Sequence, residues 1–297
     1  MLKVQNVVKT FDGFRALDDL TMTVPQGAVY GLVGPNGAGK STAIRCVTGI
    51  YKPDSGAITL SDAPVFENPA AKERIGYIPD DVFYFSAASI SDMARFYKGV
   101  CPNFDTKRFE KLKEAFELDP KQPIRRMSKG MQKQAAFWLA LSMRPELLVL
   151  DEPVDGLDPV MRRQVWSLVM ADVAEYGTTV LVSSHNLREL EDVCDHVGIM
   201  DHGKLLLERS LAELQSGTVK VLAALPEGRE LPEDLPILHR SSTGRMHTLI
   251  VRGDAETAQA MFAPLMPQYF DVVPLNLEEV FIYELGGADY AVKDILL

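Results

Sequence analysis

The chain contains few cysteines and no long apolar segment. Its three cysteines, Cys46, Cys101 and Cys194, are odd in number and widely spaced, which argues against a disulfide framework and against the paired spacing of a zinc site. The N-terminus lacks the long apolar segment of a signal peptide, and no later stretch approaches the ~20 apolar residues of a membrane span. We therefore expect a soluble, cytoplasmic chain.

Positive charge is also scarce. The sequence has 31 basic and 41 acidic residues, which gives a net charge of -10. Because proteins whose main partner is nucleic acid usually carry an excess of positive charge, we expect no nucleic-acid partner. With 297 residues, of which 46% are hydrophobic, the chain can bury one large core or two modest ones.

Hydrophobic patterning predicts an α/β fold. The segments LKVQNVV and LTMTV alternate like half-buried strands, with FDGFRAL turning between them, and GAITL follows as a further strand. We expect these segments to form an antiparallel sheet near the N-terminus. By contrast, AVYGLVG, LLVLD and TTVLVSSH are nearly continuous apolar runs, as expected for parallel strands buried on both faces.

Residues 86–144 show helical periodicity instead, which predicts a helical insertion in the α/β core at about residues 80–145. After about residue 216, prolines interrupt a polar segment before the strand-like HTLIVRG. We therefore expect two domains, residues 1–215 and a small α+β domain over residues 216–297. The apolar positions that carry the helical period are Ile90, Met93, Phe96, Tyr97, Val100, Phe109, Leu112 and Phe116.

A glycine-rich segment, GPNGAGKST, follows directly after the apolar run AVYGLV. It satisfies the phosphate-loop pattern, in which glycines let successive N–H groups face a polyphosphate at the start of a helix. In such a loop Lys40 reaches the β- and γ-phosphates and Ser41 binds Mg²⁺. The alternative is a plain glycine-rich turn. The candidate nucleotide-binding residues are Gly34, Pro35, Asn36, Gly37, Ala38, Gly39, Lys40, Ser41 and Thr42.

Two further apolar strands end in candidate catalytic groups. In LLVLDEP, Asp151 suits Mg²⁺ and Glu152 suits a general base that activates water. In SSH, His185 follows a strand at a position from which it could contact the γ-phosphate. Taken singly, the two acids also fit a solvated loop, and the histidine a structural role.

The segment RRMSKGMQKQ opens onto the apolar run AAFWLALSM and supplies Ser128 and Gly130 with cations on either side. A helix start of this kind can bind an anion through its free N–H groups. The simpler interpretation is that Ser128 is an N-cap of a core helix.

Taken together, the phosphate loop, SKGMQ, LLVLDEP, DGLD and SSH occur in the order and approximate spacing of ATP-binding cassette (ABC) transporter ATPases. The chain resembles this family over roughly residues 2–215. The resemblance implies a P-loop NTPase core with an N-terminal antiparallel β subdomain and an inserted helical subdomain, and it implies ATP and Mg²⁺ as cofactors. It also implies a head-to-tail dimer in which Ser128 and Gly130 cap the γ-phosphate that the other subunit binds.

Other positions take their expected roles from the same resemblance. Phe11 is similar to the aromatic residue that stacks on adenine, although an apolar residue at a strand end explains it equally well, and Asp158 resembles the aspartate that links the two sites of the dimer. Asp80 stands where many members have glutamine, so we expect it to bind Mg²⁺ or the catalytic water, unless it is a solvated loop acid. Lys129 and Met131 replace the more usual glycine and glutamine of the signature segment.

The resemblance thus implies an ATPase subunit that drives a separate integral membrane permease. We expect it to act as a homodimer, held peripherally on the inner face of the cell membrane. The aromatic-rich region 80–97 is the expected permease contact, with charge substitutions at exposed positions of residues 83–97 as its test, and an ordinary helical core is the alternative. The segment LNLEEVFIYELGG resembles a helix found behind the cassettes of drug and peptide exporters, which favours export. The rival interpretations are a soluble, non-transport cassette ATPase that acts on a macromolecular partner and a P-loop kinase of small molecules.

Overall fold

The computed structural model of the chain describes residues 1–226, 231, 235–276 and 279. The chain divides into two compact units. The first comprises Met1–Asn186 and Val193–Glu208, and the second comprises Leu187–Asp192 and Arg209–Leu297. All the motifs singled out above lie in the first unit, apart from the C-terminal helix-like segment. No helix among the described residues is both long and apolar enough to cross a membrane.

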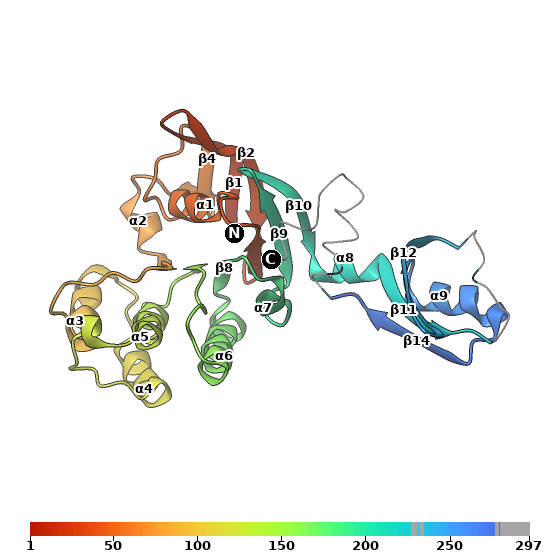
Figure 1. Cartoon of the computed structure of the whole chain (residues 1–297). Helices are drawn as coiled ribbons and strands as arrows, with labels where there is room; N and C mark the ends of the chain where they lie inside the picture. The colour runs from red at the N-terminus through yellow and green to blue at the C-terminus, as the bar shows by residue number, and fades with distance from the viewer. Residues whose placement is uncertain (227–230, 232–234, 277–278, 280–297) are drawn as a thin grey trace. The chain divides into compact units, whose positions relative to one another are not determined.

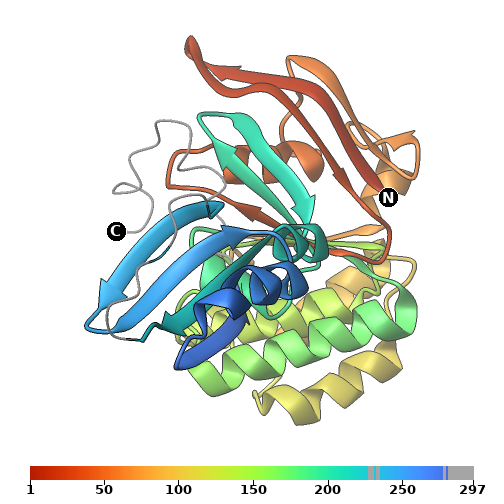
Figure 2. The same cartoon turned by 90° about the vertical axis from the view of Figure 1, so that its right-hand side faces the viewer.

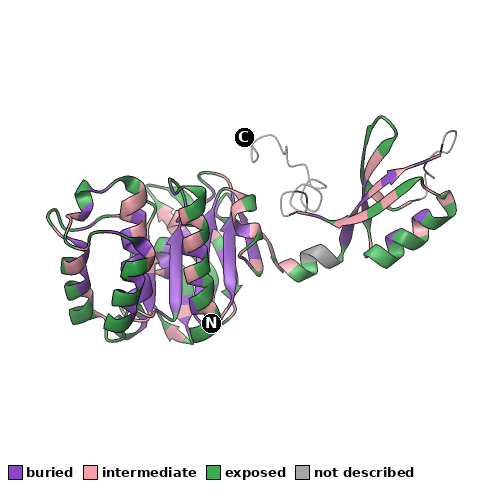
Figure 3. Cartoon of the chain, turned by 90° about the horizontal axis from the view of Figure 1, so that it is seen from below, coloured by how far each residue is buried: buried purple, intermediate pink, exposed green. Residues whose placement is uncertain are grey.

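A six-stranded sheet forms the centre of the first unit, in the order β10-β9-β3-β8-β7-β6. Strands β8, β9 and β10 of this sheet are labelled in Figure 1. The pairs β9-β3, β3-β8, β8-β7 and β7-β6 are parallel. Every residue of β3, β7 and β8 is buried, and Figure 3 shows these strands as a purple band. The prediction of parallel strands from continuous apolar runs is therefore confirmed, because such strands are covered on both faces. The strands are β3 (Val29–Val33), β6 (Ile75–Ile78), β7 (Leu147–Asp151), β8 (Thr179–Ser184), β9 (His196–Asp201) and β10 (Lys204–Ser210).

The predicted antiparallel sheet is also present, in the order β2-β1-β4-β5. Its first turn is tighter than predicted: β1 continues to Phe11 and β2 begins at Phe14, so only Asp12 and Gly13 connect them. Both connecting residues have positive φ, 48° and 85°, which matches the twist of a two-residue hairpin. The strands are β1 (Leu2–Phe11), β2 (Phe14–Val24), β4 (Ser55–Leu60) and β5 (Ala63–Pro64).

The helical insertion lies between β6 and β7, as the periodicity predicted. Helices α4, α5 and α6 lie side by side in Figure 2, and α5 contacts both of its neighbours. Trp138 of α5 stacks on Phe109 and Phe116 of α4, with ring centroids 4.9 and 6.4 Å apart. The helices of the first unit are α1 (Lys40–Val47), α2 (Pro69–Lys72), α3 (Ile90–Val100), α4 (Thr106–Phe116), η1 (Ile124–Arg126), α5 (Lys129–Ser142) and α6 (Pro159–Tyr176).

Helix α3 buries only some of the apolar residues whose periodicity predicted it. Ile90 and Met93 are buried, whereas Phe96 and Val100 are 46% and 50% exposed. The helix begins at Ile90 because Ser89 and Asp92 form a reciprocal capping box. Packing in the core therefore does not explain why the exposed side of α3 carries apolar residues.

The second unit contains a four-stranded antiparallel sheet in the order β12-β13-β11-β14. Phe262 of α9 belongs to the same buried cluster as Val221 and Leu249 of the sheet, so the predicted α+β character is seen. The predicted domain boundary falls at the end of α8, and most of the segment LNLEEVFIYELGG lies outside the described residues. The elements are α7 (Leu187–Glu191), α8 (Leu211–Ser216), β11 (Thr218–Ala224), β12 (Ile237–Thr243), β13 (Met246–Arg252), α9 (Ala255–Phe262), η2 (Ala263–Leu265) and β14 (Tyr269–Pro274).

Candidate functional site

The glycine-rich loop connects β3 to α1 in a space that admits no side chain at two positions. A Cβ at Gly34 would lie 2.1 Å from the carbonyl oxygen of Met200, and a Cβ at Gly39 would lie 2.6 Å from that of Ala16. Gly39 also begins α1 with φ = 103°, and the first turn of α1 contains no acidic residue. Glycine thus lets the loop curl tightly, and it leaves the N–H groups at the start of α1 free to face an anion.

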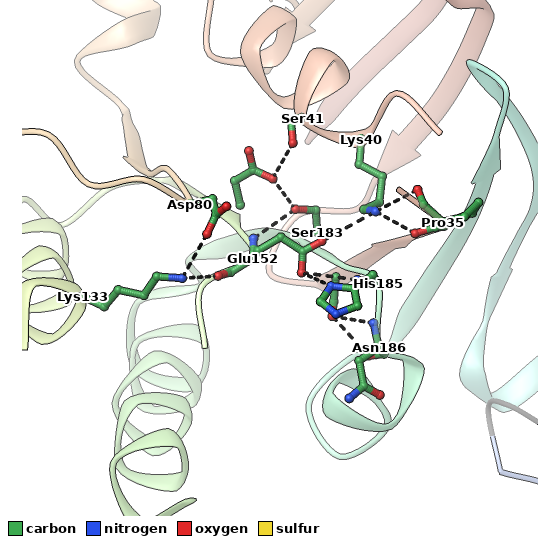
Figure 4. Close-up of polar contacts among 12 residues, drawn as sticks. Pro35, Lys40, Ser41, Asp80, Lys133, Glu152, Ser183, His185 and Asn186 are labelled. Atoms are coloured by element: carbon green, nitrogen blue, oxygen red, sulfur yellow. Dashed lines mark hydrogen bonds and ion pairs between the residues drawn. The ribbon is translucent and has the colours of Figure 1, made fainter. Parts of the chain in front are cut away.

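Lys40 points back over this loop (Figure 4). Its Nζ donates hydrogen bonds to the carbonyl oxygens of Gly34 (2.7 Å) and Pro35 (3.2 Å) and lies 3.6 Å from Glu152 Oε1. Burial lowers the pKa of Lys40, while the nearby carboxylates act in the opposite direction. The ammonium group is therefore held at the loop by groups that a phosphate oxygen could replace.

Asp151 lies at the carboxyl end of β7 and is 2% exposed. Its Oδ1 accepts hydrogen bonds from Ser41 Oγ (3.1 Å) and from Ser183 Oγ (2.7 Å). The parallel sheet creates this cluster, since β7 pairs with β8 so that Asp151 lies beside Ser183. Ser183 was not among the predicted site residues, although its place in the SSH segment was a usable signal.

The side chain of Glu152 is 13% exposed and makes three polar contacts. Its Oε2 lies 2.9 Å from His185 Nδ1 and accepts a hydrogen bond from the His185 N–H at 3.3 Å, while Oε1 faces Lys40. Burial raises the pKa of Glu152, and His185 and Lys40 partly offset this rise. A largely buried carboxylate with a raised pKa is a stronger base once ionised, which suits proton abstraction from water.

Oxygen atoms of Ser41 and Asp151 form the pair best suited to Mg²⁺. The cation prefers hydroxyl, carboxylate and water oxygens, and among the described residues no cationic side chain pairs with the buried Asp151 carboxylate. Ligand atoms of Glu152, Asp155 and His185 also lie within 4.8 Å of one another. That second group includes an imidazole nitrogen, which suits Mg²⁺ less well.

Asp80 contacts a residue that the sequence analysis did not select. Its Oδ1 lies 3.4 Å from Nζ of Lys133 on α5, and its side chain is 58% exposed. Lys133 Nζ also donates a 2.6 Å hydrogen bond to the carbonyl oxygen of Glu152 (Figure 4). A lysine two residues before the apolar run of α5 was a signal for this residue, because a lysine on a packed helix face needs a partner.

Among the described residues of the first unit, a cavity near the predicted site can be compared with a larger one elsewhere. One, of about 350 Å³, is lined by residues of the predicted site and its surroundings, including Asp80, Lys129, Lys133 and Asp155. The other, of about 530 Å³, is lined by Arg144, Tyr176 and others near the amino ends of β7 and β8, and no predicted site residue lines it. The predicted site residues Lys40, Ser41 and Asp151 lie instead at the carboxyl ends of the strands.

The signature residues occupy helix starts. Ser128 is exposed and N-caps α5, its Oγ accepting from the Met131 N–H at 3.3 Å, and Asp158 N-caps α6 in the same way. A Cβ at Gly130 would lie 3.2 Å from the carbonyl oxygen of Gly156. Ser128 is thus the N-cap of α5 within its own chain. Its role toward a partner's phosphate stays a prediction.

Phe11 is the last residue of β1 and is 38% exposed. Its ring lies 5.3 Å from that of Tyr51, edge to face, and Lys9 Nζ lies 5.3 Å from its centroid. The exposed part of the ring leaves room for a stacking partner, and adenine binding there stays a prediction.

Comparison with known proteins identifies the family. The model of the family described as "ABC transporter" matches residues 17–155. The ABC transporter ATP-binding protein YtrB of Bacillus subtilis is 30% identical over 290 residues, which cover 97% of this chain and 99% of YtrB. The Nod factor export ATP-binding protein I of Sinorhizobium fredii is 32% identical over 307 residues, which cover 96% of this chain and 86% of that protein.

The solved structures agree with the sequence comparison. The dimeric structure of the bacterial ABC transporter cassette MJ0796 matches with a TM-score of 0.66 at 20% identity, covering 71% of this chain and 99% of that one. The predicted family resemblance and fold class are therefore confirmed. The chain belongs to the ATP-binding proteins of ABC transporters, as an ATPase subunit that hydrolyses ATP for transport.

Proposed function

We propose that ATP and Mg²⁺ bind where the glycine-rich loop meets the carboxyl ends of β7 and β8. The observation that carries this proposal is the hydrogen bond between Ser41 Oγ and Asp151 Oδ1 at 3.1 Å, since it joins two motifs that lie 110 residues apart. In this arrangement Ser41 and Asp151 would hold Mg²⁺, and the bound cation would supply positive charge that neutralises the phosphates. Lys40 leaves the loop carbonyls for the β- and γ-phosphate oxygens.

Glu152 is the proposed general base. It accepts a proton from the water that attacks the γ-phosphorus, and the P–O bond to the β-phosphate breaks. His185 holds the carboxylate from the opposite side to Lys40 through two contacts, at 2.9 and 3.3 Å. Phe11 supplies a partly exposed ring for the adenine base, and Asp80 contributes to the arrangement of metal and water.

A second cassette completes each site in this proposal. ABC cassettes dimerise and pair with a membrane permease, and the exposed N-terminus of α5 at Ser128 and Gly130 suits the partner's γ-phosphate. Asp158 connects the two sites. We infer a homodimer with two equivalent sites, because this one chain carries both the phosphate loop and the signature segment.

Aromatic side chains on the helical insertion form the proposed permease contact. Phe83, Phe85 and Phe96 are 77%, 59% and 46% exposed, and the rings of Phe85 and Phe96 pack edge to face at 5.6 Å. Grouped exposed aromatic side chains are typical of interaction surfaces. The permease would hold the ATPase on the inner face of the membrane, and we propose export because the Sinorhizobium fredii relative is named for export.

Site-specific photo-crosslinking in native membranes tests the permease contact. A photoreactive phenylalanine analogue at position 85 is expected to capture an integral membrane protein. The matched control places the same analogue at Phe14, which is also well exposed, at 68%, but lies on the β1-β2 hairpin. Capture of soluble partners alone from position 85, with normal ATP hydrolysis, would favour a soluble cassette ATPase instead.

A further inference from the structure

Lys133 is a buried lysine that the proposed mechanism does not use. Its side chain is 8% exposed, and its Nζ lies 2.6 Å from the carbonyl oxygen of Glu152 and 3.4 Å from Asp80 Oδ1. Lysine is rarely buried to this degree unless its charge is paired. These contacts supply one carboxylate and one carbonyl to an ammonium group with three donors, and both contacts lead to the proposed site.

The backbone at Glu152 requires support. Glu152 has φ = 46°, in the left-handed region that residues with side chains rarely adopt. Its N–H donates to Ser183 Oγ and to the Ser183 carbonyl oxygen, both at 3.2 Å. The next residue is Pro153, which has no N–H to donate, so the carbonyl oxygen is the only hydrogen-bonding group of the peptide after Glu152. Lys133 Nζ donates to this oxygen at 2.6 Å.

Asp80 provides the charge that keeps Lys133 in place. It stands where a neutral glutamine is usual in the family, and a carboxylate there would add negative charge beside a triphosphate. The contact with Lys133 places a positive charge 3.4 Å from that carboxylate. The cavity of about 350 Å³ that both residues line gives the Asp80 side chain space to move without displacing α5.

We propose that Lys133 is a positioning residue for the general base, and that Asp80 acts by holding Lys133. Lys133 fixes the strained peptide after Glu152, so that the Glu152 carboxylate faces the phosphate loop. Lys133 lies on the same helix as Ser128, so movement of α5 toward a partner's nucleotide is transmitted to Glu152. This inference rests on the proposed role of Glu152 in hydrolysis.

The test compares Lys133→Met with the matched control Lys111→Met, which removes an exposed lysine from α4. Lys133→Met removes the charge and both contacts but keeps a long apolar side chain. We expect its kcat for ATP hydrolysis to fall by about ten- to a hundredfold, the usual effect of losing a charged hydrogen bond. The affinity of Lys133→Met for ATP should stay within about twofold of wild type. Lys133→Arg should recover at least half of the loss in kcat, measured on a logarithmic scale.

A second measurement, made without nucleotide, reports on how firmly the backbone at Glu152 is held. Amide hydrogen exchange in a peptide covering residues 151–158 should rise in Lys133→Met, while a peptide from β1 should remain protected as in the control. Asp80→Asn should slow hydrolysis in the wild-type background but have little further effect in the Lys133→Met background, because a residue that acts through another gives non-additive changes.

Three results would overturn the inference. One is hydrolysis by Lys133→Met within twofold of wild type in an assay where Glu152→Gln is inactive, which would leave the proposed function intact. Another is a loss of ATP affinity or of β1 protection comparable to the loss of rate, which would make Lys133 a general structural residue. A multiplicative effect of Asp80→Asn and Lys133→Met would show that Asp80 does not act through Lys133. Normal hydrolysis by Glu152→Gln itself would instead refute the proposed function.

Discussion

Replacing Glu152 by glutamine gives the sharpest test of the catalytic assignment. The change removes the carboxylate charge but keeps the shape, so the side-chain oxygen can still accept a hydrogen bond from the His185 N–H. General-base catalysis contributes about 10²- to 10⁴-fold to a rate, which corresponds to about 3 to 5 kcal/mol of transition-state stabilisation. We expect the hydrolysis rate at saturating Mg-ATP to fall by this factor.

The affinity of Glu152→Gln for ATP should not fall together with its hydrolysis rate. In the wild type, Lys40 Nζ lies 3.6 Å from Glu152 Oε1 and must leave this contact to reach a phosphate. Glutamine competes less well for the ammonium group, so we expect the affinity for ATP to be unchanged or to rise by up to about tenfold, or about 1.4 kcal/mol. With binding intact and hydrolysis blocked, a closed dimer should accumulate in Mg-ATP.

The assay combines single-turnover hydrolysis, equilibrium binding of a fluorescent ATP analogue, and molecular mass by light scattering with and without Mg-ATP. Glu114→Gln is the matched control, since it makes the same chemical change at an exposed position of α4. Hydrolysis by Glu152→Gln within about fivefold of the wild-type rate would refute the reasoning, because the proton would then be taken from water without the Glu152 carboxylate.

Four further predictions concern the remaining parts of the site and its partners. Lys40→Ala should weaken ATP binding and reduce hydrolysis at least about a hundredfold, because it removes the phosphate-binding charge; filter binding of labelled ATP checks this, and near-normal affinity would contradict it. Ser128→Arg should block closure of the Mg-ATP dimer in light scattering but leave ATP binding to the monomer nearly intact; a loss of monomer affinity like that of Lys40→Ala would defeat the in-trans assignment. Asp80→Asn should slow hydrolysis by about three- to thirtyfold, less than the loss of a buried charged hydrogen bond because the Asp80 side chain is 58% exposed, and it should change the Mg²⁺ dependence of hydrolysis; unchanged kinetics over a full Mg²⁺ titration would make Asp80 a solvated loop acid. Phe85→Asp should uncouple transport in native membrane vesicles while basal hydrolysis stays within about twofold, and equal losses of both would argue against a permease contact.

The sequence by itself determined the fold class and the family, and it supplied the candidate residues of the phosphate site. Continuous apolar runs specified buried parallel strands, and the glycine-rich loop specified the start of α1, because both are local consequences of residue order. The motifs at Lys40, Asp151 and Glu152 follow such strands, so their meeting at one edge of the sheet could be expected. The same local rules failed where the exact pairing mattered, as in the hairpin after Phe11, which needs two connecting residues and not seven.

Only the tertiary structure decided the partners of the proposed catalytic groups. Ser183 reaches Asp151 because β7 and β8 pair in a particular register, and Lys133 reaches Glu152 and Asp80 because α5 packs against the sheet beside them. These contacts join residues 19 to 53 positions apart in the chain, and periodicity carries no information at that range. The positive φ of Glu152 is likewise invisible in the sequence, since the surrounding contacts impose it against the residue's own preference.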